Sequence, residues 1–177
     1  MIAHSIFPAN SAEITAADLS AAQRQSEGYF RTHAGSEQIQ IDRGSREWVC
    51  ARIPECWRII KHGTEVIGST FCLPTTADQM QRFISAAISE YELFEEVRPL
   101  KSIPGEALYL CSAFVLPAYR GQGLAVAAAL QTLTWFCTRN PRPALFAWEY
   151  SSDGAKAIDR LEACISARGL RVTRRRK

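Results

Sequence analysis

The stretch that decides the fold is Arg120-Gly121-Gln122-Gly123-Leu124-Ala125. It follows an apolar, strand-like run over residues 108–116, closed by Pro117, and it opens an alanine- and leucine-rich helical pattern over residues 124–138. Two glycines let the backbone turn sharply and expose its N–H groups at the positive end of a helix dipole. We expect this turn to bind an anion, most naturally a phosphate, the alternative being a plain strand-to-helix connection without a ligand.

Two common phosphate motifs do not fit the glycine turn. A Walker loop ends in Gly-Lys-Ser/Thr, whereas this turn ends in Gly123-Leu124-Ala125. A dinucleotide fingerprint needs a glycine or alanine three positions after Gly123, where this chain has Val126. The turn is therefore neither a P-loop nor a dinucleotide-binding loop.

The turn resembles the Gln/Arg-x-x-Gly-x-Gly/Ala signature of the GNAT-type acyl-CoA N-acetyltransferases, with Arg120, Gly123 and Ala125 in its three defined places. The preceding Val115-Leu116-Pro117-Ala118-Tyr119 is similar to the Val-x-Pro-x-Tyr lead-in of that family. A second family-like block lies upstream, where β-branched runs over residues 57–61 and 64–73 flank a His62-Gly63 turn and predict a hairpin. These blocks stand in the family's order and cover about half of the chain.

Length and composition predict a single domain. The chain has 177 residues, of which 47% are hydrophobic, enough for one core and too few for two full domains. Alternating strands and helices predict an α/β fold, and the hairpin makes its central sheet mixed. We expect a GNAT-like domain over residues 1–172 with helices flanking the sheet, followed by a basic tail over residues 173–177 whose removal leaves the activity intact.

Periodicity and capping residues place the remaining elements. We expect strands over residues 2–7, 144–148 and 170–172, a helix over residues 16–32 that begins at Thr15 and ends at Gly35, and a helix over residues 155–167 that begins at Ser151, Ser152 or Asp153 and ends at Gly169. Residues 37–49 have no clear assignment, although Ile39 and Ile41 alternate as in a strand.

A helical insertion before the central strand departs from the family's usual layout. Apolar residues recur at three- and four-residue spacing between Pro74 and Pro99, which predicts one amphipathic helix over residues 75–98. It either packs on the sheet or forms a wall of the acceptor pocket, with Glu92, Glu95 and Glu96 attracting a cationic substrate.

Several functional classes are disfavoured by composition. Six scattered cysteines without a Cys-x-x-Cys pair predict buried reduced thiols, the alternative being a disulfide between Cys50 and Cys56. Three histidines, none at metal spacing, argue against a metal site. No stretch approaches the ~20 apolar residues that span a bilayer, and no secretory signal begins the sequence, so we expect a cytoplasmic protein with no membrane partner.

The family resemblance implies acetyl-CoA as co-substrate, bound where the strand over residues 108–116 separates from the strand over residues 144–150. The pantetheine arm would pair with the backbone as an added strand, and the pyrophosphate would rest on the glycine turn. The residues implied in cofactor binding are Phe114, Val115, Leu116, Arg120, Gly121, Gln122, Gly123, Leu124, Ala125 and Ser152. The N–H of Val115 is the implied oxyanion donor.

The implied reaction is direct attack of a primary amine, on a small molecule or a peptide, on the thioester. A carboxylate must first take the ammonium's proton, and Glu106 is the first candidate base and Glu149 the second. The family's tyrosine, which protonates the leaving thiolate, is replaced by Asp159 or Ile165, depending on how the last helix is aligned. Tyr150 is the nearest substitute for this acid.

The missing tyrosine keeps a second interpretation open, a non-catalytic GNAT-like module that senses CoA or binds nucleic acid or protein. The net charge is only +3, and a short arginine cluster without interleaved aromatic residues argues against a nucleic-acid partner. The sequence leaves the oligomeric state open, a homodimer being one alternative.

Overall fold

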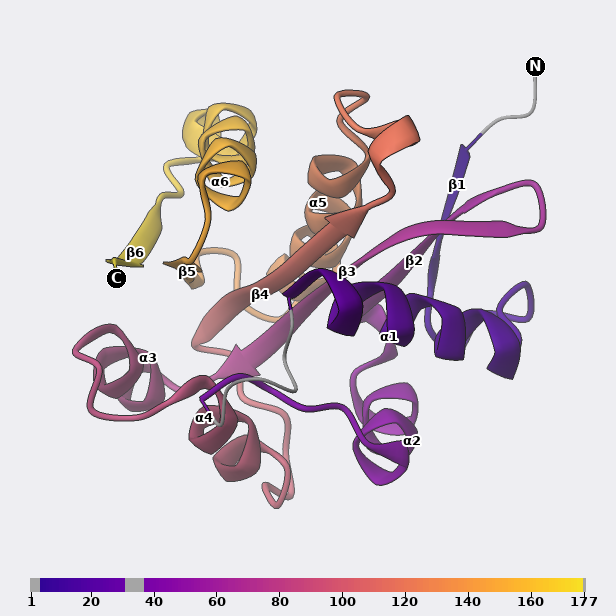
Figure 1. Cartoon of the computed structure of the whole chain (residues 1–177). Coiled ribbons are helices and arrows are strands. Elements are labelled where there is room, and N and C mark those ends of the chain that lie inside the picture. The colour runs from indigo at the N-terminus through magenta and orange to yellow at the C-terminus, as the bar shows by residue number, and fades with distance from the viewer. Residues whose placement is uncertain (1–3, 31–36, 177) are drawn as a thin grey trace.

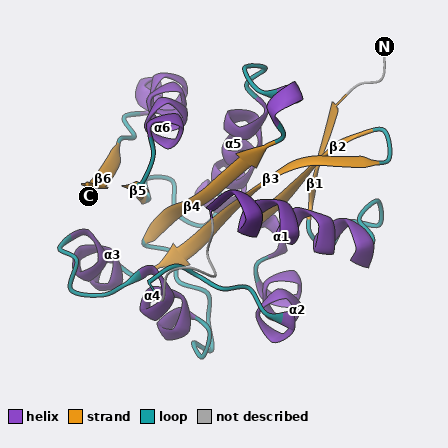
Figure 2. Cartoon of the chain, in the orientation of Figure 1, coloured by secondary structure: helices purple, strands orange, loops and turns teal. Residues whose placement is uncertain are grey.

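Six strands form one mixed sheet in the computed structural model, in the order β1-β2-β3-β4-β5-β6 (Figures 1 and 2). The structure describes residues 4–30 and 37–176. The strands are β1 His4–Pro8, β2 Trp57–His62, β3 Glu65–Thr75, β4 Ala107–Val115, β5 Ala144–Glu149 and β6 Val172–Arg176. Neighbours from β1 to β4 are antiparallel, whereas β4, β5 and β6 run parallel. The α/β fold with a mixed central sheet and a hairpin is confirmed.

Helices cover both faces of this sheet. Their bounds are α1 Ala16–Phe30, α2 Arg43–Arg52, α3 Ala77–Ile84, α4 Glu90–Val97, α5 Leu124–Cys137 and α6 Ser152–Ile165. In Figure 1, α1 lies in front of β3 and β4, and α5 lies behind them beside α6. The core between these layers contains the large buried side chains Tyr109, Phe83, Phe136, Phe146, Ile59, Leu73 and Leu108.

Local sequence signals explain where several helices begin. Thr15 and Asp18 cap α1 reciprocally, since Thr15 N donates to Asp18 Oδ2 at 2.9 Å and Asp18 N donates to Thr15 Oγ1 at 3.1 Å. Ser151 caps α6 by accepting a hydrogen bond from Gly154 N. Gly169, with φ of 72°, terminates the last helical turn as predicted. The predicted end of α1 at Gly35 and the first residues of the predicted strand at 2–7 lie outside the described residues.

Gly68 lets β3 and β4 approach closely at the end of the central strand. It pairs with Val115, and a Cβ atom on it would lie 2.5 Å from the carbonyl oxygen of Phe114. That distance is too short for any side chain, so the backbone approach itself requires glycine. Gly68 thus fixes the position of β4 relative to the hairpin.

The predicted single helix over residues 75–98 is wrong, because the insertion forms two helices. Ser89 begins a second capping box with Glu92 at the start of α4, as Thr76 does with Gln79 for α3. Between them Ala86 adopts a left-handed conformation with φ of 60°. Both helices bury apolar residues against one core. The apolar spacing therefore continues from α3 into α4, and it gives no indication of the break between them.

The structure assigns the segment that the sequence left open, and it corrects one expectation. Residues 43–52 form α2, begun by Asp42, whose side chain accepts a hydrogen bond from Ser45 N, and Ile39 and Ile41 lie before this helix outside any strand. The basic tail predicted from residue 173 is wrong for residues 173–176, because β6 continues to Arg176 and pairs with β5. Within the described residues, no helix combines the length and apolar character needed to cross a membrane.

Candidate active site

The central strand, β4, loses its pairing with β5 halfway along its length, although it stays paired with β3. Its parallel pairing with β5 begins at Ala107 and Ala144 and ends at Leu110 and Ala147, although β4 continues to Val115. At the same level the register with β3 shifts from Phe71–Ser112 to Cys72–Leu110, which leaves Cys111 as an extra residue in β4. Such a bulge bends a strand and disrupts its ladder. β4 and β5 therefore separate beyond Leu110, as the family resemblance implied.

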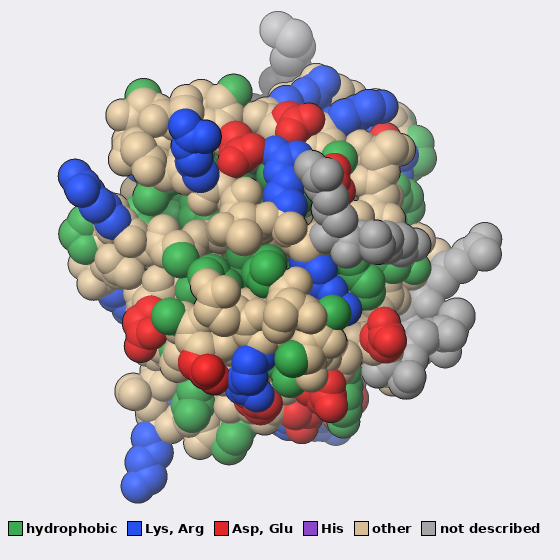
Figure 3. Space-filling view, turned by 90° about the vertical axis from the view of Figure 1, so that its left-hand side faces the viewer, with side chains coloured by type: hydrophobic (Ala, Val, Ile, Leu, Met, Phe, Trp, Pro, Cys, Tyr) green, Lys and Arg blue, Asp and Glu red, His purple; other side chains and the backbone are tan. Residues whose placement is uncertain are grey.

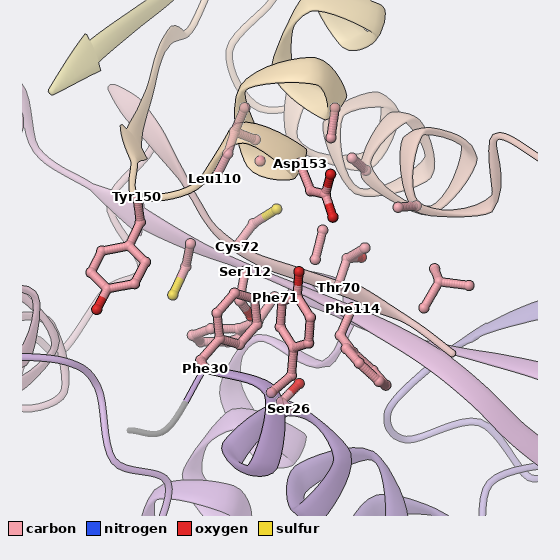
Figure 4. A pocket seen from close by; sticks show the side chains of 18 of the residues that line it. Ser26, Phe30, Thr70, Phe71, Cys72, Leu110, Ser112, Phe114, Tyr150 and Asp153 are labelled. Atoms are coloured by element: carbon pink, nitrogen blue, oxygen red, sulfur yellow. The ribbon is translucent and has the colours of Figure 1, made fainter. Parts of the chain in front are cut away.

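A cavity of about 430 Å³ opens at this separation. Its walls come from α1, β3, β4, the glycine turn, α4, the end of β5 and α6, and Figure 4 shows side chains from several of these elements converging on it. Its volume is within the usual range for small-molecule sites. Figure 3 shows the left-hand face of Figure 1, where hydrophobic side chains gather along the middle and charged ones lie above and below.

The glycine turn forms one end of the cavity. Gly121 and Gly123 have φ values of 80° and 76°, and Gly123 is the N-cap of α5. The first N–H groups of a helix have no partner within the helix, so this end of α5 presents free donors. Gly121, Gly123, Leu124 and Ala125 line the cavity. Gln122 is not among the lining residues, because its side chain turns to His4, at 3.0 Å from Oε1 to Nε2.

Phe114, Val115 and Leu116, the three residues expected to pair with pantetheine, differ in the direction in which their backbone N–H and C=O groups point. Leu116 N donates to Ile67 O at 2.8 Å, which uses that amide toward β3. Because successive residues of a strand point their polar groups to opposite edges, the N–H and C=O of Val115 face the opened side. Phe114 and Val115 line the cavity, whereas Leu116 lies outside its lining.

Arg120 joins three elements at the mouth of the cavity. Its Nε donates to Val115 O at 2.9 Å, its guanidinium lies 5.1 Å from the centre of the Tyr29 ring, and its Nη1 lies 3.8 Å from Asp153 Oδ2. Two further cationic residues, Lys156 and Arg160, line the same cavity from α6. Sequence analysis missed this pair, although their spacing from Asp153 places all three on one helical face.

The structure places Glu106 away from the cavity. It precedes the first residue of β4, at the end of the strand opposite the glycine turn, and its Oε2 accepts a hydrogen bond of 2.9 Å from Ala77 N at the start of α3. Glu106 is not one of the described residues that line the cavity. A general base must reach the proton that it removes, so the expectation that Glu106 fills this role is not supported by its position.

Of the remaining predicted site residues, Tyr150 lies at the rim of the cavity, whereas Glu149 and the expected cofactor-binding residue Ser152 do not line it. Tyr150 lines the cavity and its ring packs edge-on against Trp148, with 5.2 Å between centroids. Glu149 and Ser152 line a neighbouring pocket instead, and Glu149 Oε1 lies 4.0 Å from Arg174 Nη1. The two residues that replace the family's tyrosine are both committed elsewhere: Asp159 pairs with Arg174 at 2.7 Å, and Ile165 is fully buried.

Glu90 is a candidate functional residue that sequence analysis missed in the insertion. It is the first residue of α4, it is 8% exposed, and it lines the cavity. The three glutamates expected to attract a substrate are engaged elsewhere: Glu92 caps α4, Glu95 pairs with Arg98, and Glu96 pairs with Arg82. Recognition of the Ser89 capping box would have placed Glu90 at a helix start, but no sequence signal pointed it inward.

Two buried polar atoms of the cavity wall lack a partner among the described residues: Thr70 Oγ1 and Trp148 Nε1. Buried polar groups are nearly always hydrogen-bonded, so these two atoms leave hydrogen-bonding capacity for a water molecule or a ligand in the cavity. All six cysteines are free thiols, so Cys50 and Cys56 form no disulfide. In residues 4–30 and 37–176, no group of three or more His, Cys, Asp or Glu side chains is placed to hold a metal ion.

Comparison with known proteins gives structural neighbours only. No family model and no curated protein sequence matches the chain. Agmatine N-acetyltransferase, solved as a mutant in its apo form, is similar over 90% of this chain and 82% of its own, with 12% identity and a TM-score of 0.54. A GCN5-related N-acetyltransferase from Ralstonia eutropha JMP134 is similar over 77% of this chain and 78% of its own, with 16% identity and a TM-score of 0.42.

The third neighbour is the loading GNATL domain of CurA from Lyngbya majuscula, with 16% identity and a TM-score of 0.43 over 75% of this chain. The present chain spans 58% of that chain, less than two thirds of its length. The fold of this chain is that of the GNAT-type acetyltransferases, as the glycine turn and the hairpin indicated.

Proposed function

We propose that this chain is an acetyl-CoA-dependent N-acetyltransferase that acts on a primary amine. The observation that carries the proposal is the separation of β4 from β5 beyond Leu110, which opens one cavity from the strand bulge to the glycine turn. A strand that loses its partner exposes polar groups that an amide-bearing chain can pair with. A helix N-terminus with positive-φ glycines at the other end suits a pyrophosphate.

The residues present fit CoA at both ends of this cavity. Gly121, Gly123 and Ala125 would hold the pyrophosphate with Arg120 beside them, and Val115 would pair with the pantetheine arm. Thr70 Oγ1 is a buried atom in need of a partner between these ends. When bound, acetyl-CoA supplies an activated acetyl group, and the chain's own task is to place an amine beside it and remove a proton.

Two parts of this proposal rest on the family resemblance: acetyl-CoA as the acyl donor, and an amine on a small molecule or a peptide as acceptor. The proposed cytoplasmic location rests on the composition of the sequence instead. A homodimer remains one alternative for the assembly. Tyr150, at the rim of the cavity, stays the candidate acid for the leaving thiolate.

The alternative function is a GNAT-like module that binds CoA, nucleic acid or protein without catalysis. Its nucleic-acid form relied on the arginines after residue 172, and Arg174 is now accounted for by Asp159 and Glu162. A charge neutralised in this way contributes little to the binding of phosphates. The nucleic-acid form of this alternative therefore has less support than the sequence alone suggested.

The experiment that tests the proposal measures release of the CoA thiol from acetyl-CoA in the presence of a panel of primary amines. We expect amine-dependent release, with mass spectrometry of the product showing one added acetyl group. Tight binding of acetyl-CoA with no release for any amine would favour the binding module. Salt-sensitive binding of RNA or DNA by the same protein would then support its nucleic-acid form.

A further inference from the structure

Glu90 occupies a built polar site at the inner end of the cavity. Tyr109 donates its hydroxyl hydrogen to Glu90 Oε1 at 2.6 Å, and the Cys111 thiol donates to the same oxygen at 3.4 Å. Ile39 N donates to Oε2 at 3.1 Å. Donors from β4 and from the segment before α2 therefore fix both oxygens of a carboxylate that the insertion supplies.

This carboxylate lies where β4 parts from β5. Cys111 is the extra residue of the β4 bulge, and the last paired residues of the two strands are Leu110 and Ala147. A chain that extends along the free edge of β4 from the glycine turn reaches its end at this bulge. Glu90 thus faces the place where an acetyl group carried by that chain would arrive.

Glu90 retains one acceptor position, and among the described residues it forms no ion pair. An ionised carboxylate accepts about four hydrogen bonds, and three are used. No ion pair among the described residues includes Glu90. Arg175, the cation whose charge acts on it, lies 4.8 Å from the ring centres of both Phe83 and Trp148 and donates to Ile88 O. A cation placed beside a buried carboxylate stabilises its charged form.

We propose that Glu90 binds the ammonium group of the acceptor at this free position and takes its proton, and that the acceptor is a primary monoamine with an apolar body. This inference rests on the proposed function. The ammonium proton passes to Glu90 and later to solvent. The amine nitrogen then forms a bond to the acetyl carbon as the carbon–sulfur bond breaks. The second nitrogen proton ends on the departing sulfur, which leaves an amide and the CoA thiol.

The apolar body follows from the walls around the carboxylate. The cavity wall carries the aromatic side chains of Tyr29, Phe30, Trp57, Phe71, Phe114 and Trp148. Of the other carboxylates in the wall, Asp153 lies near Arg120 and Lys156, and Glu27 accepts from Gln23 Nε2 at 2.8 Å. An apolar chain can be buried here, whereas a second ammonium on the same chain would be desolvated without a dedicated partner.

The test compares hexylamine with 1,6-diaminohexane, which has the same chain length and a second ammonium group. Glu90→Gln keeps the size of the side chain and removes its charge, and Glu92→Gln is the matched control on the exposed side of the same helix. For wild-type protein we expect a higher kcat/KM with hexylamine than with the diamine. Glu90→Gln should lower kcat/KM for hexylamine by about 10²-fold or more. Glu92→Gln should change neither value.

The pH dependence separates proton removal from mere positioning. Within residues 4–30 and 37–176, the titratable and charged groups that act on Glu90 are Tyr109 and Cys111 on β4 and Arg175 on β6. Burial raises the pKa of the Tyr109 phenol and of the Cys111 thiol well above their ordinary values, so both stay protonated. The deficit of Glu90→Gln should shrink toward pH 10, where hexylamine is increasingly neutral. An equal deficit at every pH would overturn the role as proton acceptor.

Two binding measurements keep the inference separate from the proposed function. Calorimetry should give Glu90→Gln the wild-type affinity for acetyl-CoA, and hexylammonium alone should bind wild-type protein at least ~10-fold more tightly than it binds Glu90→Gln. Equal hexylammonium affinity in both proteins overturns the inference, whatever acetyl-CoA does. A wild-type protein that binds hexylammonium through Glu90 and ignores acetyl-CoA would contradict the proposed function instead.

Discussion

The hydroxyl of Tyr109, in the middle of the sheet, donates a hydrogen bond of 2.6 Å to Oε1 of Glu90, the first residue of α4. This contact ties the helical insertion to the central strand next to the bulge. It also holds a carboxylate in a place where water is largely excluded. Such an arrangement destabilises the charged form, and enzymes commonly place their proton acceptors in sites of this kind.

The buried carboxylate predicts how stability depends on pH. Burial raises the pKa of Glu90, although its hydrogen bonds act in the opposite direction. The folded state then holds the proton to higher pH than the unfolded state, so this group's contribution to stability falls as pH rises through the raised pKa. We expect Glu90→Gln to gain stability relative to wild type as pH rises above 4.5, the ordinary pKa of a glutamate, as measured by urea unfolding. A stability difference that does not change as pH rises from that value would contradict a raised pKa.

Glu106 should be dispensable for turnover. Its carboxylate caps the start of α3 through Ala77 N, and the amide oxygen of glutamine can accept the same bond. We expect Glu106→Gln to leave kcat/KM and its pH profile unchanged, with a stability change within about 0.5 kcal/mol. A turnover loss that diminishes at high pH would restore Glu106 as the base and remove that role from Glu90.

Gly68 should tolerate no side chain. A Cβ atom there would meet the Phe114 carbonyl oxygen at 2.5 Å, so Gly68→Ala must push β4 away from β3. We expect a loss of about 1–3 kcal/mol in the free energy of unfolding. Gly28→Ala is the control, since open space surrounds that helical position, and it should stabilise the protein by about 0.5–1 kcal/mol. Equal effects of the two substitutions would show that the close approach is not needed.

The last strand should matter for stability. Deleting residues 173–177 removes the ion pairs of Arg174 with Asp159 and Glu162, and the stacking of Arg175 between Phe83 and Trp148. We expect a fall in Tm of roughly 4–8 °C, which corresponds to about 2 kcal/mol for a chain of this size. Removal of Lys177 alone is the control and should have no effect. An unchanged Tm after the longer deletion would support the tail that the sequence suggested.

The parts of the fold that sequence analysis predicted have local signals. The glycine turn, the His62-Gly63 hairpin and the capping residues Thr15 and Ser151 each fix the backbone within a few residues. The family signature then placed the site at the strand separation. Both the fold and one end of the cavity could therefore be inferred from short segments.

The features that the sequence did not indicate depend on contacts between distant segments. Arg174 looked like a solvated tail because its partners Asp159 and Glu162 lie on α6, and only folding brings them together. Glu106 looked like a strand-end base, yet it faces α3. Glu90 lies on a helix whose apolar pattern merges with that of its neighbour. Its burial against Tyr109 is a single contact, which hydrophobic periodicity does not predict.

The central claim is that the cavity between β4 and β5 binds acetyl-CoA through the glycine turn, and calorimetric titration of acetyl-CoA tests it most directly. Valine at Gly123 would force a β-branched residue into φ of 76°, and Gly169→Val introduces the same strain at φ of 72° outside the cavity. We expect wild type and Gly169→Val to bind acetyl-CoA alike, and Gly123→Val to bind it at least ~10-fold more weakly, or about 1.4 kcal/mol. Equal affinity in Gly123→Val, or no binding by wild type, would contradict the account.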